Sequence, residues 1–356
     1  MRRLIAAAAA LIVLAVAAPA GAASWQVLLG EQTKPPAGTP KGATLNAFFP
    51  AVLQVNAGDK VKYTSRGFHT ATYLGGARPP APVFMPDPAK TTYDGINDAA
   101  GAPFYFNGLA KLIYNVGAFG PSGGTTVPGT GLVSSGVIAP GPNGKPVSAT
   151  FTFPKPGTYK LICSIHPKME GRIVVKAAGG AVQPAAAVKA KATTETAAAW
   201  ARASKLAATK PPASTVYAGI AAQTTLLAFL PKKLTVKAGT TVNFVKAPSE
   251  PHNMAFGPKK YIEGLMKKVD LFPMGPGKPN QAAPFFIYGS EQSAYSYDGT
   301  NHGNGFLVTP LTDNQPGSPP NGLAGSSRIT FTKAGKFHYF CLIHGPDMAG
   351  DIVVTP

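Results

Sequence analysis

Two short segments, one near the middle of the chain and one near its end, combine a cysteine, a histidine and a methionine at close spacing. The first contains Cys163, His166 and Met169. The second contains Cys341, His344 and Met348, with one more residue before the methionine. A thiolate, an imidazole and a weak thioether are acceptable to both Cu(I) and Cu(II), so each segment could supply three ligands of a one-electron copper site.

The second imidazole of such a site must come from another part of the chain. His69 follows a β-type run at residues 61–63, and His252 follows a similar run at residues 242–245. Their positions in the two halves of the chain correspond within two residues. The sequence therefore predicts two metal sites: His69, Cys163, His166 and Met169 in the first half, and His252, Cys341, His344 and Met348 in the second.

The same residue types also fit roles without copper. A single Cys–His–Met string is compatible with a buried free thiol beside a hydrogen-bonded histidine. Zinc is a weaker alternative, because a thioether is a poor zinc ligand and structural zinc favours closed Cys/His sets. The remaining methionines that could compete as ligands are expected to fill the core, since they lack the spacing of Met169 and Met348; they are Met85, Met254, Met266 and Met274.

Two cysteines in an exported chain would ordinarily suggest a disulfide, but an internal repeat argues against it. Residues 44–50 return as residues 225–231, and residues 55–59 return as residues 236–240. The two Cys–His–Met segments occupy the same place in the two copies. The chain is therefore a duplication, and a bridge from Cys163 to Cys341 would have to join two equivalent interior positions.

The elements that must position these ligands are short β-type runs bounded by glycine and proline. Each cysteine is preceded by a Thr/Phe alternation and followed by a closing Ile-Val-Val run. This pattern predicts an all-β antiparallel sandwich in each half. Between the first histidine and the cysteine, residues 75–144 and 257–325 are rich in Gly, Pro, Asn and Ser, and we expect two long insertions whose structure the sequence does not specify.

Each half resembles the plastocyanin/azurin family of cupredoxins. The resemblance covers roughly residues 40–75 and 146–176 in the first half and 221–257 and 326–354 in the second. It implies a Greek-key β-sandwich in each half and one type 1 copper in each of the two predicted sites. The first Cys-to-Met loop is similar in length to that of amicyanin-type members, whereas the longer second loop and the insertions depart from the family pattern. The unequal loops imply that the two coppers differ in reduction potential.

The predicted organisation is a signal peptide at residues 1–23, a cupredoxin domain at 24–176, a linker at 177–214 and a second cupredoxin domain at 215–356. The first residues combine a basic start, a short apolar run and small residues near Ala23, which is typical of a cleaved secretory signal. An uncleaved membrane anchor is the alternative, although the run is short for a span. The linker is rich in Ala, Lys and Pro, and residues 193–209 are expected to form a helix within it.

The resemblance implies an electron carrier, because a type 1 site keeps no open position for substrate. Laccase-like or nitrite-reductase-like two-domain enzymes are the alternative, but they need further histidines. The chain has six histidines, and only His302 and His338 remain outside the two predicted sites. We therefore expect no enzyme activity. Copper storage or delivery is a third class of function. Reversible cycling of the copper between Cu(II) and Cu(I), together with tight retention of the metal, would exclude it.

The formal net charge of +18 favours acidic redox partners or an anionic cell envelope. Nucleic acid is the competing partner, but no basic cluster with interleaved aromatic residues is present. The protein is expected to be exported, whether periplasmic, held at the cell surface or secreted. In the family, electrons enter near the exposed edge of the C-terminal histidine, here His166 and His344.

Overall fold

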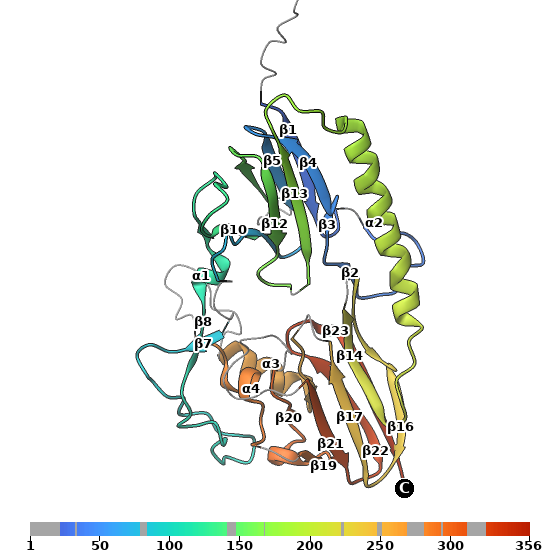
Figure 1. Cartoon of the computed structure of the whole chain (residues 1–356). Helices are drawn as coiled ribbons and strands as arrows, with labels where there is room; N and C mark the ends of the chain where they lie inside the picture. The colour runs from blue at the N-terminus through green and yellow to red at the C-terminus, as the bar shows by residue number, and fades with distance from the viewer. Residues whose placement is uncertain are drawn as a thin grey trace, which may run out of the picture.

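A computed structural model describes residues 22–32, 34–78, 84–140, 147–166, 168–221, 224–247, 251–268, 281–292, 295–311 and 325–356. Of the expected signal peptide, only Ala22 and Ala23 lie within these ranges. The chain forms two β-sandwiches, one from each half of the sequence, with a long helix along one side (Figure 1). The prediction of an all-β fold with a sandwich in each half is confirmed.

The first sandwich packs a four-stranded sheet, in the order β11-β5-β1-β3, against a six-stranded sheet, in the order β4-β13-β12-β6-β10-β9. Its strands are β1 (Ser24–Leu29), β3 (Phe48–Phe49), β4 (Val52–Asn56), β5 (Lys60–Ser65), β6 (His69–Tyr73), β9 (Pro121–Ser122), β10 (Val133–Ile138), β11 (Val147–Thr152), β12 (Gly157–Ile162) and β13 (Glu170–Lys176).

Alternation along the strands explains why they pack in this way. In β5, Val61 and Tyr63 are fully buried while Lys60 and Lys62 face solvent. Period-two alternation of this kind gives a strand one apolar face and one polar face. The apolar faces of the two sheets meet in a core that also contains Cys163 and Met169.

The second sandwich repeats the first. Its sheets have the orders β19-β21-β17-β14-β15-β2 and β16-β23-β22-β18-β20. The parallel pairs β1·β5 and β4·β13 of the first sandwich return as β14·β17 and β16·β23. Its own strands are β14 (Thr215–Ala221), β15 (Thr224–Leu230), β16 (Lys233–Lys237), β17 (Thr240–Lys246), β18 (Ala255–Phe256), β19 (Tyr295–Tyr297), β20 (Leu307–Val308), β21 (Ser326–Phe331), β22 (Gly335–Cys341) and β23 (Gly345–Thr355).

One strand crosses from the first half of the chain to the second sandwich. Strand β2 (Ala43–Leu45) pairs antiparallel with β15, with Leu45 opposite Thr224. Next to this pair, Asn46 Nδ2 donates a hydrogen bond of 3.0 Å to Thr225 Oγ1. The sequence does not predict this exchange, which joins the two units through a continuous sheet.

The segment between the sandwiches forms α2 (Ala185–Ala207), which begins earlier than the helix expected at residues 193–209. Its first residues are alanine-rich, and the Pro184 carbonyl accepts a hydrogen bond from Val188 N, so helix formation starts directly after the proline. The buried face carries Trp200 into a cluster with Leu45 of the first half and Leu226 of the second. The helix therefore packs against both units. No helix in the described part of the chain is long and apolar enough to cross a membrane.

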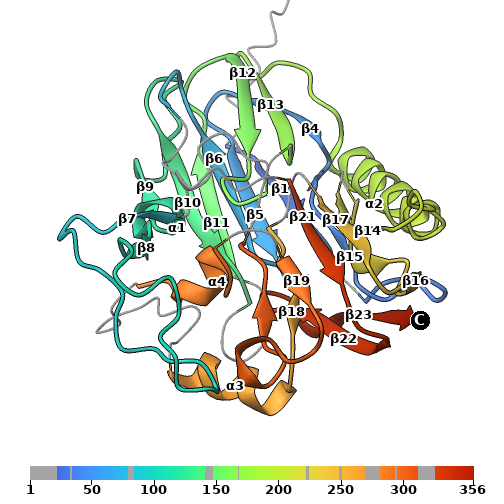
Figure 2. The same cartoon turned by 90° about the horizontal axis from the view of Figure 1, so that it is seen from below.

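The two insertions meet one another beside the second sandwich. Phe104 and Phe106 of the first insertion share an apolar cluster with Phe285 and Phe306 of the second. In Figures 1 and 2 the second-insertion helices lie beside the segment that carries β7 and β8. The described elements are β7 (Phe84–Pro86), β8 (Leu112–Tyr114), α1 (Val116–Phe119), α3 (Lys259–Lys268), α4 (Pro284–Tyr288) and a 3-10 turn at Asn301–Gly303.

Candidate metal centres

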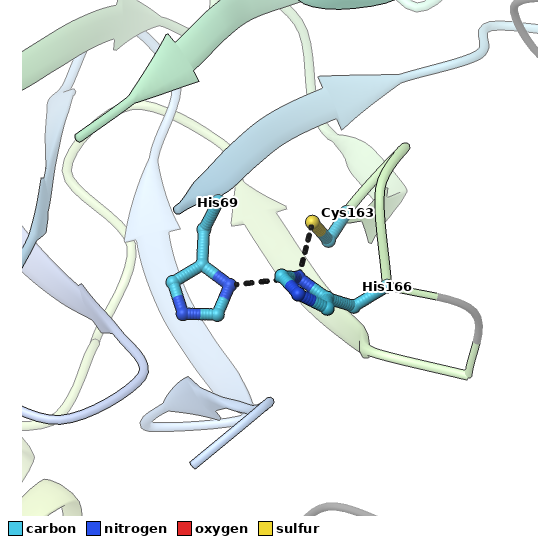
Figure 3. Close-up of side chains that lie close together, drawn as sticks. All are labelled: His69, Cys163 and His166. Atoms are coloured by element: carbon cyan, nitrogen blue, oxygen red, sulfur yellow. Dashed lines mark hydrogen bonds between the residues drawn. The ribbon is translucent and has the colours of Figure 1, made fainter. Parts of the chain in front are cut away.

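The first centre forms where three segments of the first sandwich meet. His69 is the first residue of β6, Cys163 follows β12, and His166 lies in the turn before β13. His166 Nδ1 lies 3.5 Å from Cys163 Sγ and 3.1 Å from His69 Nδ1 (Figure 3). The three side chains thus point their donor atoms at one another, as the sequence predicts.

The second centre has nearly the same geometry. Cys341 Sγ lies 3.8 Å from His252 Nδ1 and 3.5 Å from His344 Nδ1. The imidazole centroids are 4.9 Å apart here and 4.8 Å apart in the first centre. In each centre the three donor atoms lie within 4.8 Å of one another. Two imidazole nitrogens and a sulfur converging on one point form a donor set that suits copper.

Both methionines lie where the sequence expects them, at the end of the ligand loop. Cys163 N donates to Met169 O at 3.0 Å, and Met169 N donates to His166 O at 3.1 Å, so the first loop closes on itself. The longer second loop follows a bulge between Phe340 and Cys341, and Met348 already belongs to β23. Each methionine side chain is 1% exposed and packs in the core of its own sandwich. Their role as axial ligands stays a prediction.

The other methionines match their expected role as packing residues where the structure describes them. Met254 is fully buried in the core of the second sandwich. Met266 packs against the cluster formed by the insertions, and Met85 lies half-buried in β7. Met274 lies outside the described residues.

Burial differs within each set of histidines. His69 is 2% exposed and His252 is fully buried, whereas His166 and His344 are half-buried. Only the C-terminal histidine of each centre therefore reaches the molecular surface. Phe68, next to His69, leaves 42% of its surface exposed, so apolar surface is present near the first centre.

The electrostatics favour a thiolate in each centre. Burial alone raises the pKa of Cys163, but its interactions with His166 and His69 outweigh this and hold that pKa well below its ordinary value. The same balance, with His252 and His344 as partners, lowers the pKa of Cys341. Neither cysteine forms a disulfide in the structure, so the alternative of a bridge between Cys163 and Cys341 is not supported.

A hydrogen bond links the first histidine segment to the cysteine segment in each unit. Thr70 Oγ1 accepts from Ser164 N at 2.8 Å, and Asn253 Oδ1 accepts from Leu342 N at 2.9 Å. Thr70 N also points at Cys163 Sγ, at 3.4 Å. Thr70 and Asn253 directly follow the two histidines, and a polar residue at that place in both halves is the sequence signal for this hydrogen bond.

Two glycines make room for the buried histidines. Gly30 and Gly219 have φ angles of +64° and +75°, and a Cβ at either would lie 2.4 Å from Nε2 of His69 or His252. These positions therefore need glycine both for backbone conformation and for space. Gly30 and Gly219 stand at unequal distances before His69 and His252, so the sequence repeat does not align these two glycines.

The ligand loop of the second unit touches the first half of the chain. Lys41 Nζ forms an exposed ion pair of 2.8 Å with Asp347 Oδ1, next to Met348. Figure 1 shows the turn after β12 at the end of the first sandwich that faces the second. Both centres therefore lie toward the junction between the units.

The two spare histidines join neither centre. His302 Nδ1 lies 3.1 Å from Asp98 Oδ2, and its Nε2 lies 3.0 Å from Glu291 Oε1. His338 is 63% exposed and pairs with Asp351 at 3.0 Å. Within the described ranges, the groups of His, Cys, Asp and Glu able to hold a metal are the two centres above.

A family model matches a segment of the second unit that includes His252. Residues 216–283 match the model of copper binding proteins of the plastocyanin/azurin family. No curated protein matches the chain by sequence.

Solved structures that resemble the chain include an amicyanin, an auracyanin and a plastocyanin, all with low TM-scores. The Cu(I) form of an amicyanin mutant is 20% identical, with 42% of this chain and 88% of that chain covered and a TM-score of 0.22. Auracyanin A, a "blue" copper protein from Chloroflexus aurantiacus, is 20% identical, with 40% and 96% covered and a TM-score of 0.24. Oxidised plastocyanin from Dryopteris crassirhizoma is 16% identical, with 40% and 99% covered and a TM-score of 0.20. Through residues 216–283, the second unit is similar to the copper binding proteins of the plastocyanin/azurin family.

Proposed function

We propose that the protein is an exported electron carrier with one type 1 copper in each unit. The observation that carries this proposal is the convergence of a buried Cys and two His side chains at the same place in both sandwiches. His69, Cys163, His166 and Met169 would hold one copper, and His252, Cys341, His344 and Met348 would hold the other. Copper bound by such a set alternates between Cu(II) and Cu(I).

The protein's own part is to hold the ligands still. His69 belongs to β6 and Cys163 directly follows β12, and these neighbouring strands pair through Thr72 and Ile162. The Ser164–Thr70 hydrogen bond ties the two ligand segments directly. Ligands fixed by a sheet change position little between oxidation states, which favours fast electron transfer.

Electrons would enter and leave at the surface edges of His166 and His344, the half-buried ligands of each set. Phe68 supplies exposed apolar surface beside the first centre, where a redox partner could dock. The net charge of +18 favours a partner with an acidic surface or contact with an anionic envelope. Export to the periplasm, the cell surface or the medium follows from the signal-like residues 1–23.

A catalytic role has less support. A laccase-like or nitrite-reductase-like enzyme needs further imidazoles that meet beside a type 1 site. His302 and His338 instead pair with carboxylates, Asp98 and Glu291 for the first and Asp351 for the second. We therefore propose electron transfer without a catalytic copper.

The test is a visible spectrum with copper quantification on the mature protein and on the variants Cys163→Ser and Cys341→Ser. Two coppers per chain and an intense thiolate-to-copper band, partly lost in each variant, would support the proposal. A colourless protein that takes up no copper would overturn it. Reversible reduction without loss of copper would separate a carrier from a copper delivery protein.

A further inference from the structure

A buried lysine lies in the second sandwich where the first has a serine. Lys246, at the end of β17, is 3% exposed. It pairs in register with Ala218, just as Ser65 at the end of β5 pairs with Leu29. Ala218 and Leu29 each precede the glycine that packs against the first histidine ligand. Lys246 and Ser65 therefore occupy the same place relative to the two centres.

The ammonium group of Lys246 has neutral hydrogen-bond partners. Its Nζ donates to Pro310 O at 3.0 Å and to Ser327 Oγ at 3.2 Å. These contacts satisfy two of its three N–H donors, and neither partner is a carboxylate that would neutralise its charge. A buried charge with neutral partners acts over a longer range than a surface charge, because little water screens it.

The contacts of Lys246 place it beside the second centre. Ala218, its strand partner, is followed by Gly219, which packs against the His252 ring. Pro310 follows Thr309, whose backbone and side chain both hydrogen-bond to Met254, two residues after His252. Burial lowers the pKa of Lys246 to about 7, and the charge of Cys341 acts in the opposite direction, so the lysine and the thiolate interact.

We propose that Lys246 tunes the second centre: its buried positive charge gives this copper a higher reduction potential than the copper of the first centre. The inference rests on the proposed function, since it needs copper in both centres. Reduction takes one electron from an external donor and converts Cu(II) to Cu(I), so the site loses one unit of positive charge. A fixed positive charge nearby favours the reduced form, and Ser65 provides no such charge in the first unit.

The test compares Lys246→Met with the parent in the full chain carrying Cys163→Ser, so that only the second centre can form a blue site. We would measure its reduction potential at about pH 6, which favours the charged lysine, and its Cu(I) and Cu(II) affinities by chelator competition. Loss of this charge predicts that the ratio of Cu(I) to Cu(II) affinity falls in Lys246→Met, on the order of tenfold for a unit charge in an effective dielectric near 20. The potential falls correspondingly.

Two controls separate charge from structure. Lys246→Arg keeps the charge and is expected to keep the affinity ratio and the potential of the parent. In the Cys341→Ser background, where only the first centre remains, Lys246→Met is expected to leave the potential unchanged. Lys246→Gln is a second neutral variant in case Lys246→Met folds poorly.

The possible failures can be told apart. An unchanged potential and affinity ratio in a blue, copper-binding Lys246→Met protein would overturn the role of Lys246 and leave the proposed function intact. A Cys163→Ser protein whose second centre takes up no copper would overturn both proposals.

Discussion

Asn46 Nδ2 lies 3.0 Å from Thr225 Oγ1, in a hydrogen bond between the two halves of the chain that is buried from solvent. It stands at the end of the β2·β15 pairing, which carries a strand of the first half into the second sandwich. A buried polar pair of this kind helps to fix the register of the two strands, because a slipped register would break this hydrogen bond.

We predict that Thr225→Val weakens the junction without altering either copper centre. The change leaves the buried Asn46 amide without this acceptor, so the free energy of unfolding should fall by about 1–3 kcal/mol. Denaturant unfolding measures this loss, and the blue band should keep its position. Thr241→Val is the matched control, because Thr241 pairs with Thr330 at an exposed site. An equal loss in both variants would contradict the role of the junction.

The glycines beside the histidine ligands give a second prediction. Gly30→Ala should abolish copper binding in the first centre alone, and Gly219→Ala in the second alone, because the new Cβ would overlap the imidazole. Positive φ adds about 1–2 kcal/mol of backbone strain to either change. With the proposed loading of one copper in each unit, copper per chain should fall from two to one in each variant.

Gly38→Ala is the control for backbone strain. Gly38 has a φ of +80°, but a Cβ there would meet no atom within 4 Å. Gly38→Ala should therefore lower the stability through backbone strain but leave the copper content unchanged. Full copper content in both Gly30→Ala and Gly219→Ala would mean that the histidine rings can move aside.

The grouping of one cysteine with two histidines in each half could be predicted from sequence because these residues lie in short segments that recur in both halves. Cys163, His166 and Met169 are joined by one loop, so their spacing alone brings them together. The β2·β15 exchange could not be predicted, since residues 43–45 resemble any short strand and pairing across about 180 positions leaves no local signal. The structure of the two insertions cannot be predicted from sequence for a related reason. Their aromatic residues pack against each other across the two units and follow no helix or strand period within one segment.

The hydrogen bond between ligand segments leads to a third prediction. Asn253→Ala removes the acceptor of Leu342 N and should loosen Cys341 relative to His252. The second centre should then lose copper faster to a chelator, with the first centre unchanged. Asn253→Thr copies the first unit, where Thr70 fills this role, and should restore retention. Equal rates of copper loss in Asn253→Ala and the parent would show that this hydrogen bond does not help to retain the metal.

The contact between His302 and the carboxylates of Asp98 and Glu291 predicts a pH dependence. Burial lowers the pKa of His302, but the two carboxylates outweigh burial and raise it above its ordinary value. A histidine whose folded pKa is raised stabilises the fold fully below its unfolded pKa of about 6.5, and this stabilisation is lost as the pH rises through the folded value. Asp98 belongs to the first insertion and His302 to the second, so the meeting of the insertions should weaken at high pH.

Hydrogen exchange of residues 95–108 checks this expectation. Protection should be greater at about pH 6 than at about pH 9 after correction for the intrinsic exchange rate. His302→Gln should reduce protection at the lower pH and flatten the difference, since glutamine carries no charge at either pH. His338→Gln is the control, because the exposed side chain of His338 pairs with Asp351 and takes no part in the contact with Asp98 and Glu291. A difference that persists in His302→Gln would show that other groups govern the contact.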